Sequence, residues 1–337
     1  MFFREEKRME SMISKLFKDL ENGKMDRRRL LQALGLTAGA AVAASAVPAT
    51  LFAQTSAGGG RSFPPTTMNH LSLAVKDYAK SRDFYVDLFG MQVRWDDGKG
   101  AEVVFGPPAE VDGIYIRPVG ANAKPGVGHM AFGVPTTYFL ENKSGMKAEM
   151  ERRGLENIRP DGEYGWIAND PAGYMQNTWV PVSDGAMFPG AASPCKVAKS
   201  QECVSAFEAG RKNLSNAPKP SGKGFKAIYY SNIVLSVPEA DIPKEKEFYS
   251  GMYGMKITSE NKDGVSMKFG KNTLSIGKTA NPGDKPYCTR YGFAIENYDQ
   301  AKVKAELERR GLNPQPGPGT GWTIKDPDGM TIEITGS

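Results

Sequence analysis

The side chain best suited to bind a metal or to move a proton near neutral pH is histidine, and it occurs twice in the 337-residue chain, as His70 and His129. A metal site built from three histidines is therefore excluded, and so is a site with two histidine ligands and a third histidine as base. The 3 cysteines are too few for a four-cysteine zinc site. The sequence also lacks a Gly-x-x-x-x-Gly-Lys-Ser/Thr phosphate loop and a Gly-x-Ser-x-Gly nucleophile turn. Metal chemistry would therefore need the two histidines together with side chains of other types.

The elements that would position these histidines belong to an internal repeat. Matching blocks recur in the same order, at 84–91 and 248–255, at 147–155 and 304–312, and at 165–173 and 321–329. The blocks carry Phe-Tyr, Phe/Tyr-Gly-Met, Lys-Ala-Glu-x-Glu-Arg-Arg-Gly-Leu, Gly-Trp and Asp-Pro-x-Gly. They predict two copies of one domain, at 62–182 and 226–337, joined by a linker at 183–225.

Hydrophobic periodicity predicts the same order of elements twice in each copy. In the first copy, helices are predicted at 78–89 and 138–153, and Gly90 and Gly154 end them. Strands are predicted at 69–75, 92–95, 102–105, 113–118, 127–134, 166–169 and 175–181. The order is strand, helix, strand, strand, strand, which gives four such units in an α+β chain. The Glu-Arg-Arg-Gly ends of the repeated helices look like a solvent-exposed face.

These blocks resemble the vicinal oxygen chelate (VOC) superfamily, which includes glyoxalases, bleomycin-resistance proteins and extradiol dioxygenases. The resemblance covers both copies. It implies two tandem domains, each of paired βαβββ units that form a curved, cup-like mixed sheet. In this superfamily a metal lies in the cup, bound from the first strand of each unit and from a terminal strand. His70 and His129 fall on such first strands, and Asn177 falls where the family has a glutamate.

The resemblance implies one divalent metal ion, Fe, Mn, Zn or Ni, since imidazole suits these ions. The third position weakens this prediction, because the neutral amide of Asn177 is a poor ligand. In the second copy, Asn232 and Arg290 align with the two histidines, and the glutamate is present as Glu333. We expect Glu333 to pair with Arg290 and the second domain to be metal-free.

Aromatic residues at or near strand positions predict a pocket for a small-molecule ligand or substrate in the first domain; they are Trp95, Tyr115, Phe132, Trp166 and Trp179. One expected function is a divalent-metal-dependent lyase, isomerase or dioxygenase of glyoxalase or dioxygenase type, acting on a small oxygen-rich or aromatic molecule. The alternative is a metal-free small-molecule-binding protein of the bleomycin-resistance type. Both remain open at this point, and the catalytic residues are unknown.

Residues 1–53 have the layout of an export signal. Arg27, Arg28 and Arg29 precede an uncharged Ala/Gly-rich run that ends at small residues near Ala53, and the pattern resembles a twin-arginine signal. A membrane anchor is the weaker alternative because the run is short. We therefore expect an exported protein, periplasmic or extracellular, with no membrane contact after cleavage.

The linker and the net charge give two further expectations, a disulfide bond and no binding of nucleic acid. Cys195 and Cys203 lie in the linker, and outside the cytoplasm they are expected to form a disulfide bond. The formal net charge of the whole chain is +5, and most of the excess falls in residues 1–53. The remaining chain carries no basic footprint of a nucleic-acid-binding protein.

Overall fold

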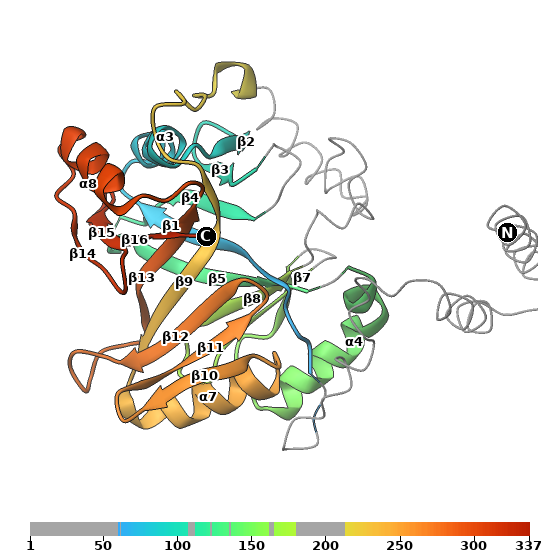
Figure 1. Cartoon of the computed structure of the whole chain (residues 1–337). Helices are drawn as coiled ribbons and strands as arrows, with labels where there is room; N and C mark the ends of the chain where they lie inside the picture. The colour runs from blue at the N-terminus through green and yellow to red at the C-terminus, as the bar shows by residue number, and fades with distance from the viewer. Residues whose placement is uncertain are drawn as a thin grey trace, which may run out of the picture. The chain divides into compact units, whose positions relative to one another are not determined.

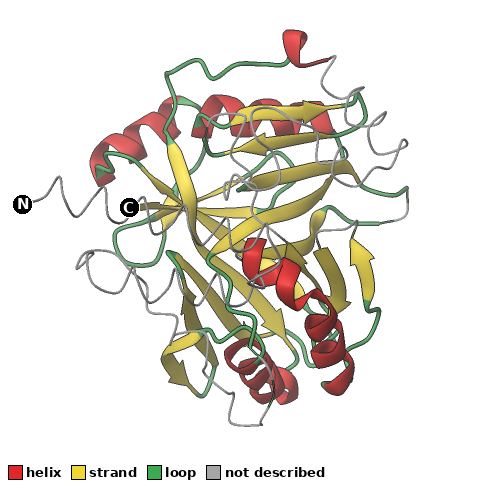
Figure 2. Cartoon of the chain, turned by 90° about the vertical axis from the view of Figure 1, so that its right-hand side faces the viewer, coloured by secondary structure: helices red, strands yellow, loops and turns green. Residues whose placement is uncertain are grey.

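The computed structural model describes residues 60, 62–106, 112–121, 123–134, 136–161, 165–179 and 213–337. The predicted signal segment and the predicted Cys195–Cys203 bond lie outside these residues. All of these described residues belong to one compact unit. The part that the structure describes is built on two mixed sheets of eight strands each, flanked by helices (Figures 1 and 2). None of the described helices is long and apolar enough to cross a membrane.

The first sheet consists of two βαβββ units joined side by side. Its elements are β1 (Thr67–Val75), α3 (Tyr78–Phe89), β2 (Gln92–Asp96), β3 (Ala101–Val104), β4 (Gly113–Pro118), β5 (Gly126–Gly133), α4 (Thr136–Arg152), β6 (Arg159–Asp161), β7 (Gly165–Asn169) and β8 (Met175–Trp179). The strand order is β2-β3-β4-β1-β5-β8-β7-β6. β1 is parallel to β4, β5 is parallel to β8, and the antiparallel pair β1–β5 joins the two units.

The second sheet repeats this topology. Its elements are β9 (Ala227–Val237), α7 (Ile242–Gly251), β10 (Lys256–Asn261), β11 (Gly264–Phe269), β12 (Asn272–Lys278), β13 (Tyr287–Ile295), α8 (Gln300–Arg309), β14 (Gln315–Pro316), β15 (Trp322–Lys325) and β16 (Thr331–Gly336). Two short 3-10 turns, Asn213–Asn216 and Glu239–Asp241, precede β9 and α7. The order β10-β11-β12-β9-β13-β16-β15-β14 matches the first sheet strand by strand. The α+β fold of two tandem, duplicated domains is confirmed.

Local sequence signals explain where the first helix begins and ends. The Asp77 side chain accepts a hydrogen bond from the backbone N–H of Lys80, which caps the start of α3. Gly90 ends the helix with φ at +65°, a left-handed conformation that residues with a side chain rarely adopt. The bounds of α3 are the predicted ones, and α4 begins two residues before its predicted start.

The two domains share one hydrophobic core. Phe132 of β5 packs its ring against Tyr249 and Tyr253 of the second domain. Tyr85 of α3 packs in the reciprocal direction against Phe293 of β13. The helices α3 and α7 therefore each bury an aromatic side chain against the sheet of the other domain: Tyr85 of α3 against β13, and Tyr249 of α7 against β5.

The ends of α4 and α8 bridge the domains, so the prediction of a solvent-exposed face is wrong for one arginine of each pair. The Arg153 side chain is 7% exposed and donates from Nη1 to Oε1 of Glu247 in α7, 3.1 Å away. Its counterpart, Arg310, contacts Asp87 of α3. The spacing of charges along a helix does not show that a second domain covers it.

Candidate functional site in the first cup

His70 and His129 lie on one face of the first sheet, on the antiparallel pair β1 and β5. His70 pairs in register with Ala131, and His129 pairs with Ser72. Side chains two residues apart on a strand share a face, so all four positions face the same way. The intervening Leu71 belongs to the hydrophobic core on the opposite face. The strand pairing therefore brings together two histidines that lie 59 residues apart in sequence.

The two imidazoles face each other through their Nε2 atoms, which are 3.0 Å apart. The Nδ1 atom of His70 lies 2.7 Å from Oδ1 of the buried Asn69. A carbonyl oxygen accepts only, so His70 carries its proton on Nδ1 and its Nε2 presents a lone pair to His129. Asn69 thus fixes both the tautomer and the orientation of His70, as an outer partner of a metal-ligating histidine does.

Both imidazoles are held neutral. Burial lowers the pKa of His70 well below its ordinary value, and His129 and Arg94 lower it further. Burial lowers the pKa of His129 to about 4, with a contribution from Arg159. A neutral imidazole is the form that binds a metal ion. A metal ion would therefore not have to displace the extra proton of an imidazolium from either ring.

The two Nε2 atoms lie close enough to share an ion. The 3.0 Å separation of the two Nε2 atoms is a hydrogen-bond distance, and the same two converging nitrogens are the atoms that would hold a divalent ion. Asn177 is in register with Ala131, which places its backbone in the row that contains His70, but its side chain lies outside what the structure describes. No group of three or more His, Cys, Asp or Glu side chains that could hold a metal occurs among the described residues. The pair is therefore a two-nitrogen half-site.

A carboxylate that the sequence did not reveal lies on the same face of the sheet. Glu102 of β3 is in register with Tyr115 of β4, which is in register with Ser72. Arg94 contacts Glu102 with Nε to Oε2 at 3.1 Å, and the Tyr115 hydroxyl also hydrogen-bonds to Glu102. Burial raises the pKa of Glu102, and Arg94 and Tyr115 oppose this rise. Glu102 is thus occupied by two partners, so it serves as a polar wall of the cup.

Only some of the aromatic residues predicted to line a pocket lie on the histidine face. The ring of Tyr115 meets His70 edge-on, with centroids 4.7 Å apart. Trp95 is in register with Glu102, and the guanidinium of Arg117 stacks over its ring. Phe132 and Trp166 instead lie in the hydrophobic core, so their assignment to the pocket is corrected. Trp179 is in register with Gly165, and its side chain is not described.

In the second cup, Asn232, Arg290 and Glu333 lie close together, as the sequence predicts. Gly292 is in register with both Asn232 and Glu333, as Ala131 is with His70 and Asn177. Arg290 forms the expected ion pair with Glu333, with Nε to Oε2 at 3.3 Å. Asn232 also hydrogen-bonds to Glu333. The Glu333 carboxylate therefore contacts an arginine and an amide, and the positions equivalent to His70 and His129 hold no histidine.

Comparisons with known proteins agree with this architecture. Residues 67–175 match the family model described as the Glyoxalase/Bleomycin resistance protein/Dioxygenase superfamily. Comparison with curated protein sequences gives no match. The family match spans the strands that carry His70 and His129, and it supports the resemblance to the VOC superfamily.

Solved structures share the fold of both domains. The 2,3-dioxygenase LapB from Pseudomonas sp. KL28 is 14% identical, with a TM-score of 0.57 over 82% of this chain and 94% of that one. The Mn(II)-bound glyoxalase from Novosphingobium aromaticivorans is 14% identical, with a TM-score of 0.58 over 81% and 82%. A variant of homoprotocatechuate 2,3-dioxygenase from Brevibacterium fuscum in complex with HPCA is 17% identical, with a TM-score of 0.56 over 81% and 72%. The chain thus has the fold of tandem VOC domains.

Proposed function

We propose that the first domain binds one divalent metal ion through His70 and His129 and acts on a small oxygen-rich or aromatic molecule as a lyase, isomerase or dioxygenase. The observation that carries this proposal is the 3.0 Å separation of the two Nε2 atoms, together with the neutral state of both rings. Proteins of this fold include a Mn(II)-bound glyoxalase and 2,3-dioxygenases. The sequence identities are too low to select among these reactions.

The described residues support binding and orientation of a substrate. Asn69 holds the His70 ring, and Tyr115 packs against its edge. Arg94, tied to Glu102, keeps a guanidinium on the same face of the sheet. When bound, a divalent metal supplies polarisation of a substrate oxygen. The protein supplies two neutral nitrogen ligands, and substrate oxygens or water would complete the coordination.

The alternative function is metal-free binding of a small molecule in the same cup, as in bleomycin-resistance proteins. One observation favours it: Glu102 is held by Arg94 and Tyr115 and offers no free carboxylate to a metal. In this alternative, His129 donates its Nε2–H to His70, and the two rings form part of a polar ligand wall.

Metal binding by purified protein separates the two functions. We would fold the full chain in the cytoplasm, strip it of metal and titrate it with Mn(II) in a calorimeter. We expect one site per chain in the wild type and its loss in the His70→Gln/His129→Gln variant. Asn232→Ala, at the position equivalent to His70 in the second cup, should bind like wild type. Equal and substoichiometric metal in all three proteins would refute the metal proposal and favour the binding protein.

We also propose that the protein is exported through the segment 1–53, with a periplasmic or extracellular destination. The support is the order of Arg27, Arg28 and Arg29, the uncharged run and the small residues near Ala53. Replacing Arg27 and Arg28 by Lys should leave the protein in the cytoplasm of a bacterium that has twin-arginine export. Unchanged export of that variant would contradict a twin-arginine route.

A further inference from the structure

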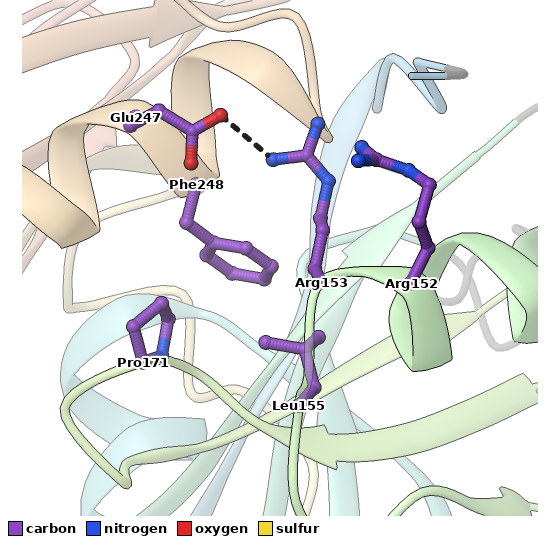
Figure 3. Close-up of a pocket in the computed structure, with 6 residues that line it drawn as sticks. All are labelled: Arg152, Arg153, Leu155, Pro171, Glu247 and Phe248. Atoms are coloured by element: carbon purple, nitrogen blue, oxygen red, sulfur yellow. Dashed lines mark hydrogen bonds and ion pairs between the residues drawn. The ribbon is translucent and has the colours of Figure 1, made fainter. Parts of the chain in front are cut away.

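A cavity of about 210 Å³ lies where the end of α4 meets α7 (Figure 3), and neither His70 nor His129 is among the residues that line it. Its lining joins residues of the two domains: Arg152, Arg153, Leu155 and Pro171 from the first and Glu247 and Phe248 from the second. Figure 3 shows the two guanidinium groups side by side, with the Phe248 ring between Glu247 and the apolar pair Leu155 and Pro171. The cavity thus has one end formed by arginines paired with glutamates and one apolar end.

The arginines at the charged end are not fully hydrogen-bonded. Arg152 uses Nε and Nη2 on Glu149, and Arg153 uses Nε on Glu149 and Nη1 on Glu247. The Nη2 of Arg153 is buried and has no hydrogen-bond partner among the residues that the structure describes. A guanidinium carries five N–H donors in a planar fork, which matches the two oxygens of a carboxylate.

The two acids at this end differ in how firmly they are held. The Glu149 side chain is 5% exposed and contacts both arginines, so it is a fixed part of the site. The Glu247 side chain is 65% exposed and contacts Arg153 from the rim. Ion pairs at such exposed positions are weak, because water competes with them. A ligand carboxylate with an apolar body to bury can therefore replace Glu247 at Arg153.

The apolar end fits a flat ring. Phe248 is 1% exposed and belongs to the shared core, so its ring is a fixed wall. Leu155 packs against the same core. An apolar cavity of about 150 Å³ holds a benzene molecule, and the cavity here is about 210 Å³. The volume accommodates one ring together with a carboxylate group.

We propose that this cavity is a second ligand site, which binds a small aromatic carboxylate with its charge on Arg152 and Arg153 and its ring against Phe248. Glu247 acts as a competing internal carboxylate that leaves Arg153 when the ligand binds. The site shares no lining residue with the histidine pair and needs no metal there. Failure of this proposal would therefore leave the proposed function unaffected, and the reverse also holds. Because both domains contribute to the lining, an occupied site would also strengthen the contact between them.

Calorimetric titration of the full chain with benzoate tests the proposal. We expect saturable binding, with one site per chain. Arg152→Gln should weaken binding at least tenfold, and Glu247→Gln should tighten it by removing the competitor. Benzamide, which has the same ring without the charge, should bind at least tenfold more weakly than benzoate. Arg309→Gln changes the matched arginine of the second domain and should bind like wild type.

The proposal fails if benzoate does not saturate, if benzamide binds equally well, or if Arg152→Gln and Glu247→Gln leave the affinity unchanged. It also fails if the His70→Gln/His129→Gln variant loses benzoate binding, because the ligand would then occupy the cup. Thermal melting of each variant shows that the fold is retained, and the opposite signs expected for Arg152→Gln and Glu247→Gln cannot both come from misfolding.

Discussion

Phe63 donates its backbone N–H to the carbonyl oxygen of Met252, 2.6 Å away, and so attaches the segment before β1 to the end of α7. The second domain repeats this contact in reverse, because Phe225 donates to the carbonyl oxygen of Leu88 in α3 at 2.7 Å. Each domain therefore begins with a short segment that is bound to the first helix of the other. The Phe63 side chain is also fully buried in the shared core.

Phe63→Ala should lower the free energy of unfolding by about 3–5 kcal/mol, the usual cost of removing a buried phenylalanine ring. Urea denaturation followed by fluorescence measures the change. Ile257→Ala is the control, because Ile257 is 40% exposed and its replacement should change stability by less than about 0.5 kcal/mol. A similar small effect for both variants would show that the segment before β1 does not hold the domains together.

Tyr230→Phe should destabilise the protein by about 1–3 kcal/mol, because it removes two hydrogen bonds to backbone groups in the buried sheet. The Tyr230 hydroxyl accepts from the N–H of Leu71 at 3.3 Å and donates to the carbonyl oxygen of Gly113. Both partners belong to the first domain. Thermal and urea unfolding measure the loss, and Tyr287→Phe, on an exposed ring, should be neutral. Equal stability of the two variants would rule out this link between the domains.

Asn69→Leu should weaken Mn(II) binding roughly 10- to 100-fold, the usual effect of removing a group that orients a ligating histidine. The Leu side chain keeps much of the volume but offers no acceptor to Nδ1 of His70. Metal titration provides the measurement. Ser231→Ala, the residue before Asn232 in the second cup, is the matched control. Unchanged affinity in Asn69→Leu would mean that His70 is oriented by other contacts.

The buried pair Asp170 and Glu245 should make stability fall as the pH rises. Glu245 accepts from the N–H of Ala172 at 2.6 Å, and Asp170 accepts from the hydroxyl of Tyr249 at 2.9 Å. Burial, and then the neighbouring Asp170, raise the pKa of Glu245 well above its ordinary value of 4.5. The folded protein therefore keeps a proton that the unfolded chain loses above pH 4.5.

Glu245→Gln should flatten this pH dependence by more than about 1.4 kcal/mol between pH 5 and pH 8, the free energy of one pKa unit. Urea unfolding at a series of pH values measures the slope. Glu247→Gln, two residues further along α7 and 65% exposed, should keep the wild-type slope. A slope that persists in Glu245→Gln would assign the effect to other groups.

Much of the fold was predictable because its signals are local. The spacing of apolar residues, together with Gly90, was enough to place α3 at its observed bounds. β6 was missed because Arg-Pro-Asp at 159–161 has no polar and apolar alternation, and its pairing with β7 is all that makes it a strand. The pairing of two βαβββ units into one mixed sheet followed from the family resemblance, and the order of the strands was not predicted.

The candidate site was predictable only in part. The scarcity of histidine pointed to His70 and His129, which the structure places in contact. Glu102 and Arg94 were missed because their nearness to His70 depends on the register of β2, β3 and β4. Phe132 was assigned to the pocket because the residue type alone does not show on which face of the sheet the side chain lies. Alternation along β5 carries that information, since His129 and Ala131 share one face and Phe132 lies on the other.

The shared core makes the two halves of the chain obligatory partners. Tyr85 and Phe132 are buried against rings of the opposite domain, and the segments at Phe63 and Phe225 cross between domains in both directions. Either half produced alone would expose the face that the other now covers. The single chain thus contains, in covalent form, the interface that two separate copies of one domain would need in order to fold as a symmetric dimer.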